Sequence, residues 1–276
     1  YGVRVKRIQN ILDYVPQKDI DFGDINNDYI NGVVEFKNVS YEIKNKKILD
    51  KVSFKAYPNE INVIVGHSGS GKSTIINLLY RLKRIKSGEI LIDDESIYNY
   101  TKDVYASNVS GVFQKPFVFE MSIKDNLSLI DSDYKNQVEA CKRVGIHEFI
   151  MNLPKGYNTI LTEEQCILSD GQKQLLAIAR ALLSKSEILL LDELTSNIDP
   201  SSTTKVGEIL VDLKTDHTIL LVTHKPEMMA LADHVIVLDN GKVVCKGLNK
   251  DVYQKSSLYR ELTSRTFASI SKNDME

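Results

Sequence analysis

The nine residues Gly66-His67-Ser68-Gly69-Ser70-Gly71-Lys72-Ser73-Thr74 lie between two apolar runs, 61–65 and 75–79. This order predicts a strand, a glycine-rich loop and a helix. Backbone N–H groups of such a loop and the positive end of the helix dipole attract phosphate, and the glycines allow a close approach. The spacing G-x4-G-K-S matches the phosphate-loop signature, in which Lys72 reaches the β- and γ-phosphates and Ser73 binds Mg²⁺. An ordinary helix-capping turn has no need of the lysine, so the segment predicts a site for a nucleoside triphosphate.

Length, charge and cysteine content narrow the class of protein. The 276 residues carry a formal net charge of -2, which argues against a nucleic-acid partner because such binding usually needs a basic surplus. Cys141, Cys166 and Cys245 form no C-x-x-C pair and have no histidine at metal-ligand spacing, so we expect reduced, intracellular thiols. No apolar run approaches the roughly 18 residues that a membrane span needs. We expect a soluble piece of a longer protein, because the chain begins at Tyr1 without methionine.

The first 32 residues differ in pattern from the rest of the chain. Apolar residues recur at helical spacing over 1–12, which predicts the end of an amphipathic helix that Pro16 terminates. The stretch 17–32 is polar and rich in asparagine, with no apolar period to pack. It is therefore expected to be a linker.

Apolar patterns after residue 32 predict the fold class. Strands are expected over 33–41, 52–57, 87–93, 109–114, 187–193 and 218–224, and a closing hairpin over 235–245 with its turn at Asn240-Gly241. Between Ser122 and Ser184 the pattern is helical, and Ser122 with Asp125 resembles an N-cap box. Unbroken apolar runs are typical of strands buried on both faces of a parallel sheet. We therefore expect an α/β fold: a phosphate-loop NTPase core with an N-terminal antiparallel β-subdomain and an inserted helical subdomain.

Two adjacent carboxylates, Asp192 and Glu193, end the apolar run 188–191. A carboxylate at a strand end beside a phosphate loop usually holds Mg²⁺ through water, and a second one can polarise a nucleophilic water. The alternative is that one of the two only caps the following turn. The pair predicts hydrolysis of the bound triphosphate.

The segment Leu168-Ser169-Asp170-Gly171-Gln172, followed by the helical run 173–182, resembles the signature helix of ABC ATPases. The similarity extends over about 33–252, with the helical subdomain at about 115–184, and leaves 253–276 as a C-terminal helix and polar tail. It implies the ABC ATPase architecture, with ATP and Mg²⁺ as ligands.

The resemblance also implies roles for single residues. Tyr41 is similar to the aromatic residue that stacks on adenine, Gln114 to the glutamine that contacts Mg²⁺ and the attacking water, and His224 to the switch histidine on the γ-phosphate. The expected catalytic residues are Glu193, His224, Gln114 and Lys72. The expected Mg²⁺ ligands are Ser73, Gln114 and, through water, Asp192. The residues expected to bind ATP are Tyr41, Gly66, Ser68, Gly69, Ser70, Gly71, Lys72, Ser73, Thr74, Ser169, Gly171, Gln172 and Asp199.

A serine hydroxyl and glycine N–H groups at a helix start form an anion site. The resemblance implies that Ser169 and Gly171 bind the γ-phosphate on another copy of the domain, in a head-to-tail dimer with two ATP molecules between the copies. Asp199 belongs to 196–199, a segment similar to the loop that crosses this dimer.

Two positions depart from the family pattern. Asp170 replaces the usual glycine of the signature, and a carboxylate near a triphosphate is unfavourable unless it faces solvent or a base. Gln165 stands where exporters usually keep a glycine. These departures put full-rate turnover and coupling in doubt.

The resemblance implies the ATPase domain of an ABC exporter, at the cytoplasmic face of the cell membrane and fused at its N-terminus to a transmembrane domain. Import with a separate membrane subunit is one alternative. A soluble ABC ATPase of chromosome maintenance or translation is a second, but such proteins carry long coiled-coil insertions or a second ATPase domain. A phosphotransferase is a third, but it would lack the signature helix and the switch histidine.

Overall fold

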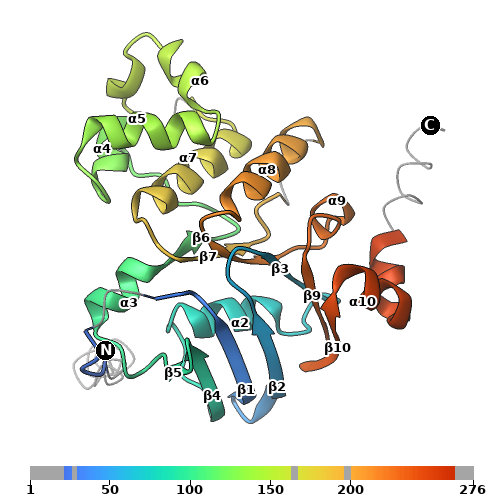
Figure 1. Cartoon of the computed structure of the whole chain (residues 1–276). Helices are drawn as coiled ribbons and strands as arrows, with labels where there is room; N and C mark the ends of the chain where they lie inside the picture. Colours follow the sequence, from blue (N-terminus) through green and yellow to red (C-terminus); the bar gives the residue numbers. More distant parts are fainter. Residues whose placement is uncertain (1–21, 27–29, 163–166, 196–199, 265–276) are drawn as a thin grey trace, which may run out of the picture.

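The computed structural model describes residues 22–26, 30–162, 167–195 and 200–264. In Figure 1 two sheets lie one above the other, and a group of helices projects from the upper one. The expected helix end at 1–12, Gln165 and the segment 196–199 lie outside the described residues.

The larger sheet has six strands in the order β10-β9-β3-β8-β7-β6. They are β3 (Ile61–Val65), β6 (Val109–Val112), β7 (Ile188–Asp192), β8 (Thr218–Val222), β9 (His234–Asp239) and β10 (Lys242–Leu248). All neighbours pair in parallel except β9 and β10, which form the expected hairpin. Val63 packs into one hydrophobic cluster and Ile64 into another on the opposite face. The sheet is therefore buried on both sides, as its unbroken apolar runs predict.

The smaller sheet is antiparallel, with strand order β2-β1-β4-β5. Its strands are β1 (Val34–Ile43), β2 (Lys46–Ala56), β4 (Ser87–Ile92) and β5 (Glu95–Ser96). Helix α2 (Lys72–Leu79) shares one hydrophobic cluster with both sheets, because Ile75 contacts the group that contains Phe36 and Ile64. The antiparallel β-subdomain predicted from the sequence is thus confirmed.

The region between β6 and β7 is helical. It contains α4 (Ile123–Ser128), α5 (Tyr134–Arg143), α6 (His147–Met151), the short 3-10 helix η1 (Gly156–Asn158) and α7 (Asp170–Leu183). The Ser122 side chain accepts the N–H of Asp125, so the predicted N-cap is present. The other helices are α3 (Lys102–Asn108), α8 (Pro200–Leu213), α9 (Pro226–Met229), α10 (Asn249–Lys255) and a helix over 257–264.

The end of the expected linker packs against the β-subdomain, which its sequence does not predict. Ile30 is only 2% exposed. The Asp93 carboxylate accepts backbone N–H groups of Asn31, Gly32 and Val33. The buried Ile30 side chain and the backbone hydrogen bonds to Asp93 fix this segment. Such packing leaves no repeating apolar pattern in the sequence.

Within the ranges that the structure describes, no helix combines the length and apolar character needed to cross a membrane.

Candidate active site

The phosphate loop connects β3, in the middle of the six-stranded sheet, to α2. Gly71 has φ 106°, and a Cβ there would lie 2.6 Å from Leu49 Cδ2. A Cβ on Gly66 would lie 2.0 Å from the Leu238 carbonyl oxygen. Glycine is therefore required at both fixed positions of the signature for local packing as well as for ligand approach.

Lys72 lies over the loop with its ammonium group enclosed. Its Nζ donates to the carbonyl oxygens of Gly66, at 2.8 Å, and His67, at 2.9 Å. Burial lowers the pKa of Lys72, while the negative charges of Glu193 and Asp192 oppose that effect. The residue thus places a cation at the mouth of the loop, as the sequence predicts.

The loop and the end of β7 together fit a magnesium–phosphate ligand. The Ser73 hydroxyl donates to Asp192 Oδ1 at 3.4 Å. Burial raises the pKa of Asp192, the Glu193 charge adds to this, and Ser73 and Lys72 oppose it. Hydroxyl and carboxylate oxygens suit Mg²⁺, which takes its remaining ligands from water and phosphate. The Ser70 hydroxyl is buried and has no hydrogen-bond partner among the described residues, so it can donate to a phosphate oxygen.

Glu193, Gln114 and His224 meet beside the loop, at the carboxyl ends of neighbouring parallel strands. The Glu193 N–H donates to the Val222 carbonyl, which ties the end of β7 to the end of β8. Gln114 Nε2 donates to Glu193 Oε2 at 2.9 Å, and His224 Nδ1 lies 3.7 Å from Glu193 Oε1. Two side chains from distant parts of the sequence therefore flank the Glu193 carboxylate, as expected for strand ends in an open α/β sheet.

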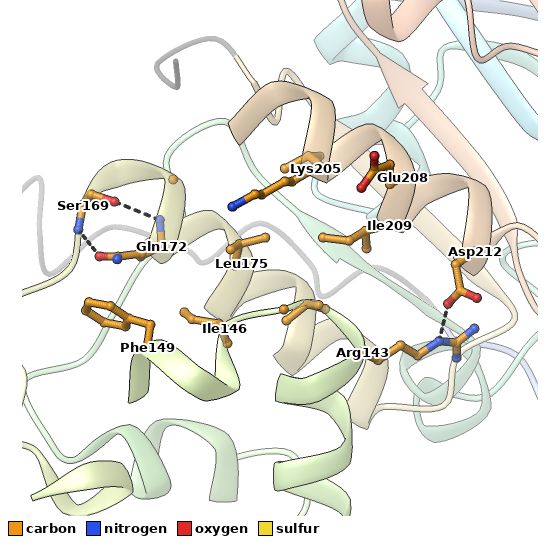
Figure 2. Close-up of a pocket in the computed structure, with 14 residues that line it drawn as sticks. Arg143, Ile146, Phe149, Ser169, Gln172, Leu175, Lys205, Glu208, Ile209 and Asp212 are labelled. Carbon is orange, nitrogen blue, oxygen red and sulfur yellow. Dashed lines mark hydrogen bonds and ion pairs between the residues drawn. The ribbon is translucent and has the colours of Figure 1, made fainter. Parts of the chain in front are cut away.

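The signature residues lie in a different place, at the start of α7. The Ser169 hydroxyl accepts the Gln172 N–H at 3.2 Å, and the Ser169 N–H donates to Gln172 Oε1 at 2.8 Å. Figure 2 shows this reciprocal cap at one end of a pocket of about 620 Å³. The pocket lies between α7, α8 and residues of the range 143–149. Lys205 extends from α8 across the pocket toward the cap. Ser169, Gly171 and Gln172 line this pocket, and no residue of 66–74 does.

The Asp170 side chain, next to this cap in the sequence, is largely exposed to solvent. Its side chain is 64% exposed, and Oδ1 lies 3.4 Å from the Lys173 ammonium. Both conditions under which a carboxylate is tolerated near a triphosphate are therefore met, because solvent and a base each oppose its charge.

Tyr41 lies in the core of the β-subdomain. It is 9% exposed, pairs with Leu49 across the hairpin, and belongs to the hydrophobic cluster under the β-subdomain. Its ring is thus largely enclosed by the core, and contact of Tyr41 with a base stays a prediction. Two residues further on, Ile43 is 46% exposed.

Four residues expected to bind ATP remain, and the structure describes three of them. Ser68 and Gly69 are exposed at the loop, and Thr74 is partly buried at the start of α2. Asp199 lies outside the described residues.

Gln174 is a buried polar residue beside the site that the sequence reasoning missed. It is 4% exposed on α7, and its Nε2 donates to the Gln114 carbonyl oxygen at 3.0 Å. The signal was available, because Gln174 falls at positions i−4 and i−7 from Ile178 and Ala181, on the buried face of the helix. A polar residue on that face needs a specific partner.

Comparisons with known proteins identify the family of the chain. A sequence model of the ABC transporter family matches residues 49–196. The chain is similar to an ATP-dependent lipid A-core flippase of Haemophilus influenzae (strain 86-028NP), with 37% identity over 94% of this chain and 44% of that protein. It is 36% identical to a putative multidrug export ATP-binding/permease protein of Bacillus subtilis, over 85% of this chain and 41% of that protein.

A solved structure of a bacterial Atm1-family ABC exporter with ATP bound gives a TM-score of 0.83 and 29% identity. The match covers 96% of this chain and 47% of that chain. The chain thus spans less than half the length of each of these proteins.

Proposed function

Because this chain belongs to the ABC transporter family, we propose that it hydrolyses ATP to drive transport out of the cell by a larger membrane protein. The observation that carries the proposal is the meeting of Gln114, Glu193 and His224 next to Lys72 and Ser73. This set contains a cation that can bind the triphosphate, oxygen atoms that can bind a metal ion and a carboxylate that can orient a water molecule. Transfer of a phosphoryl group to water requires these groups.

The proposed reaction is in-line attack of water on the γ-phosphorus. Glu193 orients the water and accepts its proton, and the Gln114 amide that donates to Glu193 keeps the carboxylate in place. Lys72 and His224 hold the γ-phosphate. Ser73, Gln114 and, through water, Asp192 hold Mg²⁺, which when bound neutralises charge that develops on the phosphates.

We infer that the complete site needs a second copy of the domain. The anion-binding start of α7 lines a pocket without phosphate-loop residues, so Ser169 and Gly171 are available to a nucleotide on another copy. A head-to-tail pair with two-fold symmetry forms two such sites at once. The Gln174–Gln114–Glu193 chain of hydrogen bonds connects the signature helix to the catalytic carboxylate.

This chain has a surface beside Gln114 on which we propose that the membrane partner docks. Phe113, Phe117 and Phe119 are 44%, 68% and 37% exposed, and Phe117 and Phe119 pack edge to face. They line a pocket of about 340 Å³. An apolar patch of this kind is typical of a protein interface. We propose that loops of an N-terminally fused transmembrane domain bind here, which places the ATPase at the cytoplasmic face of the membrane.

The formal net charge of -2 gives no support to a nucleic-acid partner.

A Glu193→Gln variant tests the proposal. We expect it to bind Mg²⁺–ATP as the unchanged chain does but to lose hydrolysis, because the amide cannot accept the proton of water. The trapped nucleotide should produce an ATP-dependent dimer in light scattering. Glu139→Gln, an exposed change on α5, is the matched control and should leave turnover unchanged. Normal hydrolysis by the Glu193 variant would contradict the assigned role.

A further inference from the structure

Three charged side chains connect the helical subdomain to α8. Arg143, in the last turn of α5, donates from Nε to Asp212 Oδ2 at 2.8 Å and from Nη2 to Asp216 Oδ2 at 2.6 Å. Asp212 lies in the last turn of α8, and Asp216 lies in the turn that follows this helix. One guanidinium group therefore joins elements that are 69 and 73 residues apart along the chain.

The two carboxylates are poorly placed for α8 itself. A negative charge near the C-terminus of a helix opposes the helix dipole, and neighbouring carboxylates repel each other. Arg143 offsets both effects, and its hydrogen bond lowers the pKa of Asp216. The planar guanidinium makes its two hydrogen bonds in one fixed orientation. The contact is thus directional, and it fixes where the end of α5 lies relative to α8.

This contact lies at one end of the pocket of about 620 Å³ between α7 and α8. Figure 2 shows Arg143 and Asp212 at the end opposite the cap formed by Ser169 and Gln172. The pocket separates the first turn of α7 from α8. A contact that joins the helical subdomain to α8 at the far end of the pocket therefore controls this separation.

The position of α5 is passed on to α7 by packing. Helix α5 contacts α7 directly, and its residues Cys141 and Val144 are fully buried in the hydrophobic cluster that contains Leu176 of α7. A shift of α5 relative to α8 consequently moves α7 as well. It changes the direction in which the first turn of α7 presents Ser169 and Gly171.

We propose that Arg143 is a positioning residue, which sets the separation between the helical subdomain and α8 and thereby aligns Ser169 and Gly171 with the nucleotide on a second copy. This inference rests on the proposed function. The pocket that Arg143 lines contains no residue of 66–74. Arg143 therefore acts on the assembly of two copies and leaves the binding of ATP to one copy unchanged.

The test uses the Glu193→Gln chain, in which light scattering at graded protein concentrations follows dimerisation with Mg²⁺–ATP. Adding Arg143→Ala should raise the concentration for half-dimerisation about tenfold, because a contact that couples two parts of the site is lost. Binding of a fluorescent ATP analogue to the monomer should be unchanged. Thermal unfolding should shift by a few degrees at most, since a largely exposed ion pair adds little stability.

An exchange of charges separates alignment within the chain from a direct contact of Arg143 with the second copy. Arg143→Asp should weaken dimerisation more than Arg143→Ala does, because three carboxylates then lie together. Combining Arg143→Asp with Asp212→Arg restores opposite charges between α5 and α8, so most of the dimerisation should return. A direct contact with the second copy would not be restored. Lys142→Ala, at the exposed lysine next to Arg143, is the matched control and should dimerise normally.

The possible outcomes separate this inference from the proposed function. Normal dimerisation of Arg143→Ala, a loss of its monomer ATP affinity, or no recovery in the charge exchange would each overturn the inference alone. If Arg143→Ala does not fold, replacing both Asp212 and Asp216 with asparagine breaks the same contact from α8 and must give the same loss. Absence of an ATP-dependent dimer in the Glu193→Gln chain itself would overturn the proposed second copy, and the inference with it.

Discussion

Lys72 is a buried cation that is fixed by carbonyl oxygens of its own loop. It is 7% exposed, and its two hydrogen bonds, to Gly66 and His67, are with neutral acceptors. A buried cation that contacts only neutral acceptors and has carboxylates nearby is stabilised further when an anionic ligand binds to it. The hydrogen bonds that fix Lys72 in the loop therefore also position the charge that binds the nucleotide.

Replacing Lys72 with alanine should weaken ATP binding by about 10- to 100-fold, the loss expected for one or more hydrogen bonds to a charged group. Calorimetry with Mg²⁺–ATP measures the change. Lys155→Ala, at an exposed lysine before η1, is the matched control and should bind ATP normally. ATP affinity that survives the loss of Lys72 would contradict the phosphate-cradle assignment.

Residue spacing predicts some of the site and fails for other parts of it. Lys72, Ser73, Asp192 and Glu193 are predictable because each is fixed by local sequence next to a strand end. The position of Tyr41 is not, because its burial depends on register shifts between β1 and β2. Such shifts arise from the pairing of two strands, and alternation within one strand does not reveal them.

At the scale of the element, α7 contributes to two separate parts of the site. Its first turn presents Ser169 and Gly171, and its buried face carries Gln174 to the Gln114 carbonyl. Sequence reasoning identified the first turn because the signature is contiguous. It missed the second contact because the partner lies 60 residues away along the chain.

Asp170 offers a test of how this helix start handles charge. An Asp170→Gly variant should preserve or raise the ATPase rate, because it removes a negative charge from beside the expected γ-phosphate site. The exposed pair with Lys173 contributes little stability, on the order of 0–1 kcal/mol. Steady-state ATP hydrolysis measures the rate, and thermal unfolding checks that the helix is intact.

The Lys173→Ala variant is the complementary change. It leaves Asp170 in place and removes the base at 3.4 Å, so turnover should fall if that pair keeps the carboxylate charge opposed. A large loss of activity in Asp170→Gly would show that the aspartate has a function of its own.

At the scale of the molecule, the order of strands in the larger sheet brings the catalytic residues together. The phosphate loop follows β3, the two carboxylates lie at the end of β7, and His224 follows β8, which lies between β3 and β7. Apolar runs in the sequence predict the strands and their burial. They do not predict this lateral order, because neighbours such as β3 and β8 are more than 150 residues apart.

A buried histidine directly before β8 links stability to pH. His217 is 8% exposed, and its Nδ1 donates to the Ser186 carbonyl oxygen at 2.7 Å. Burial lowers the pKa of His217 below 6.5, and Arg143 adds to this, while the Ser186 carbonyl, Asp216 and Glu187 oppose it. The folded chain thus keeps this imidazole neutral at a pH where the unfolded chain protonates it.

The sign of the pH effect follows from proton binding. As the pH falls below 6.5, the unfolded chain binds a proton at His217 that the folded chain does not, so the free energy of unfolding decreases. It stops decreasing below the folded pKa, where both states are protonated. A His217→Asn variant keeps a donor for the Ser186 carbonyl but cannot be protonated. Its urea unfolding at pH 7.5 and 5.5 should therefore show a smaller loss of stability than the unchanged chain, since all other titrating groups are shared. Equal losses in the two chains would mean that His217 is protonated in the fold, in conflict with its burial.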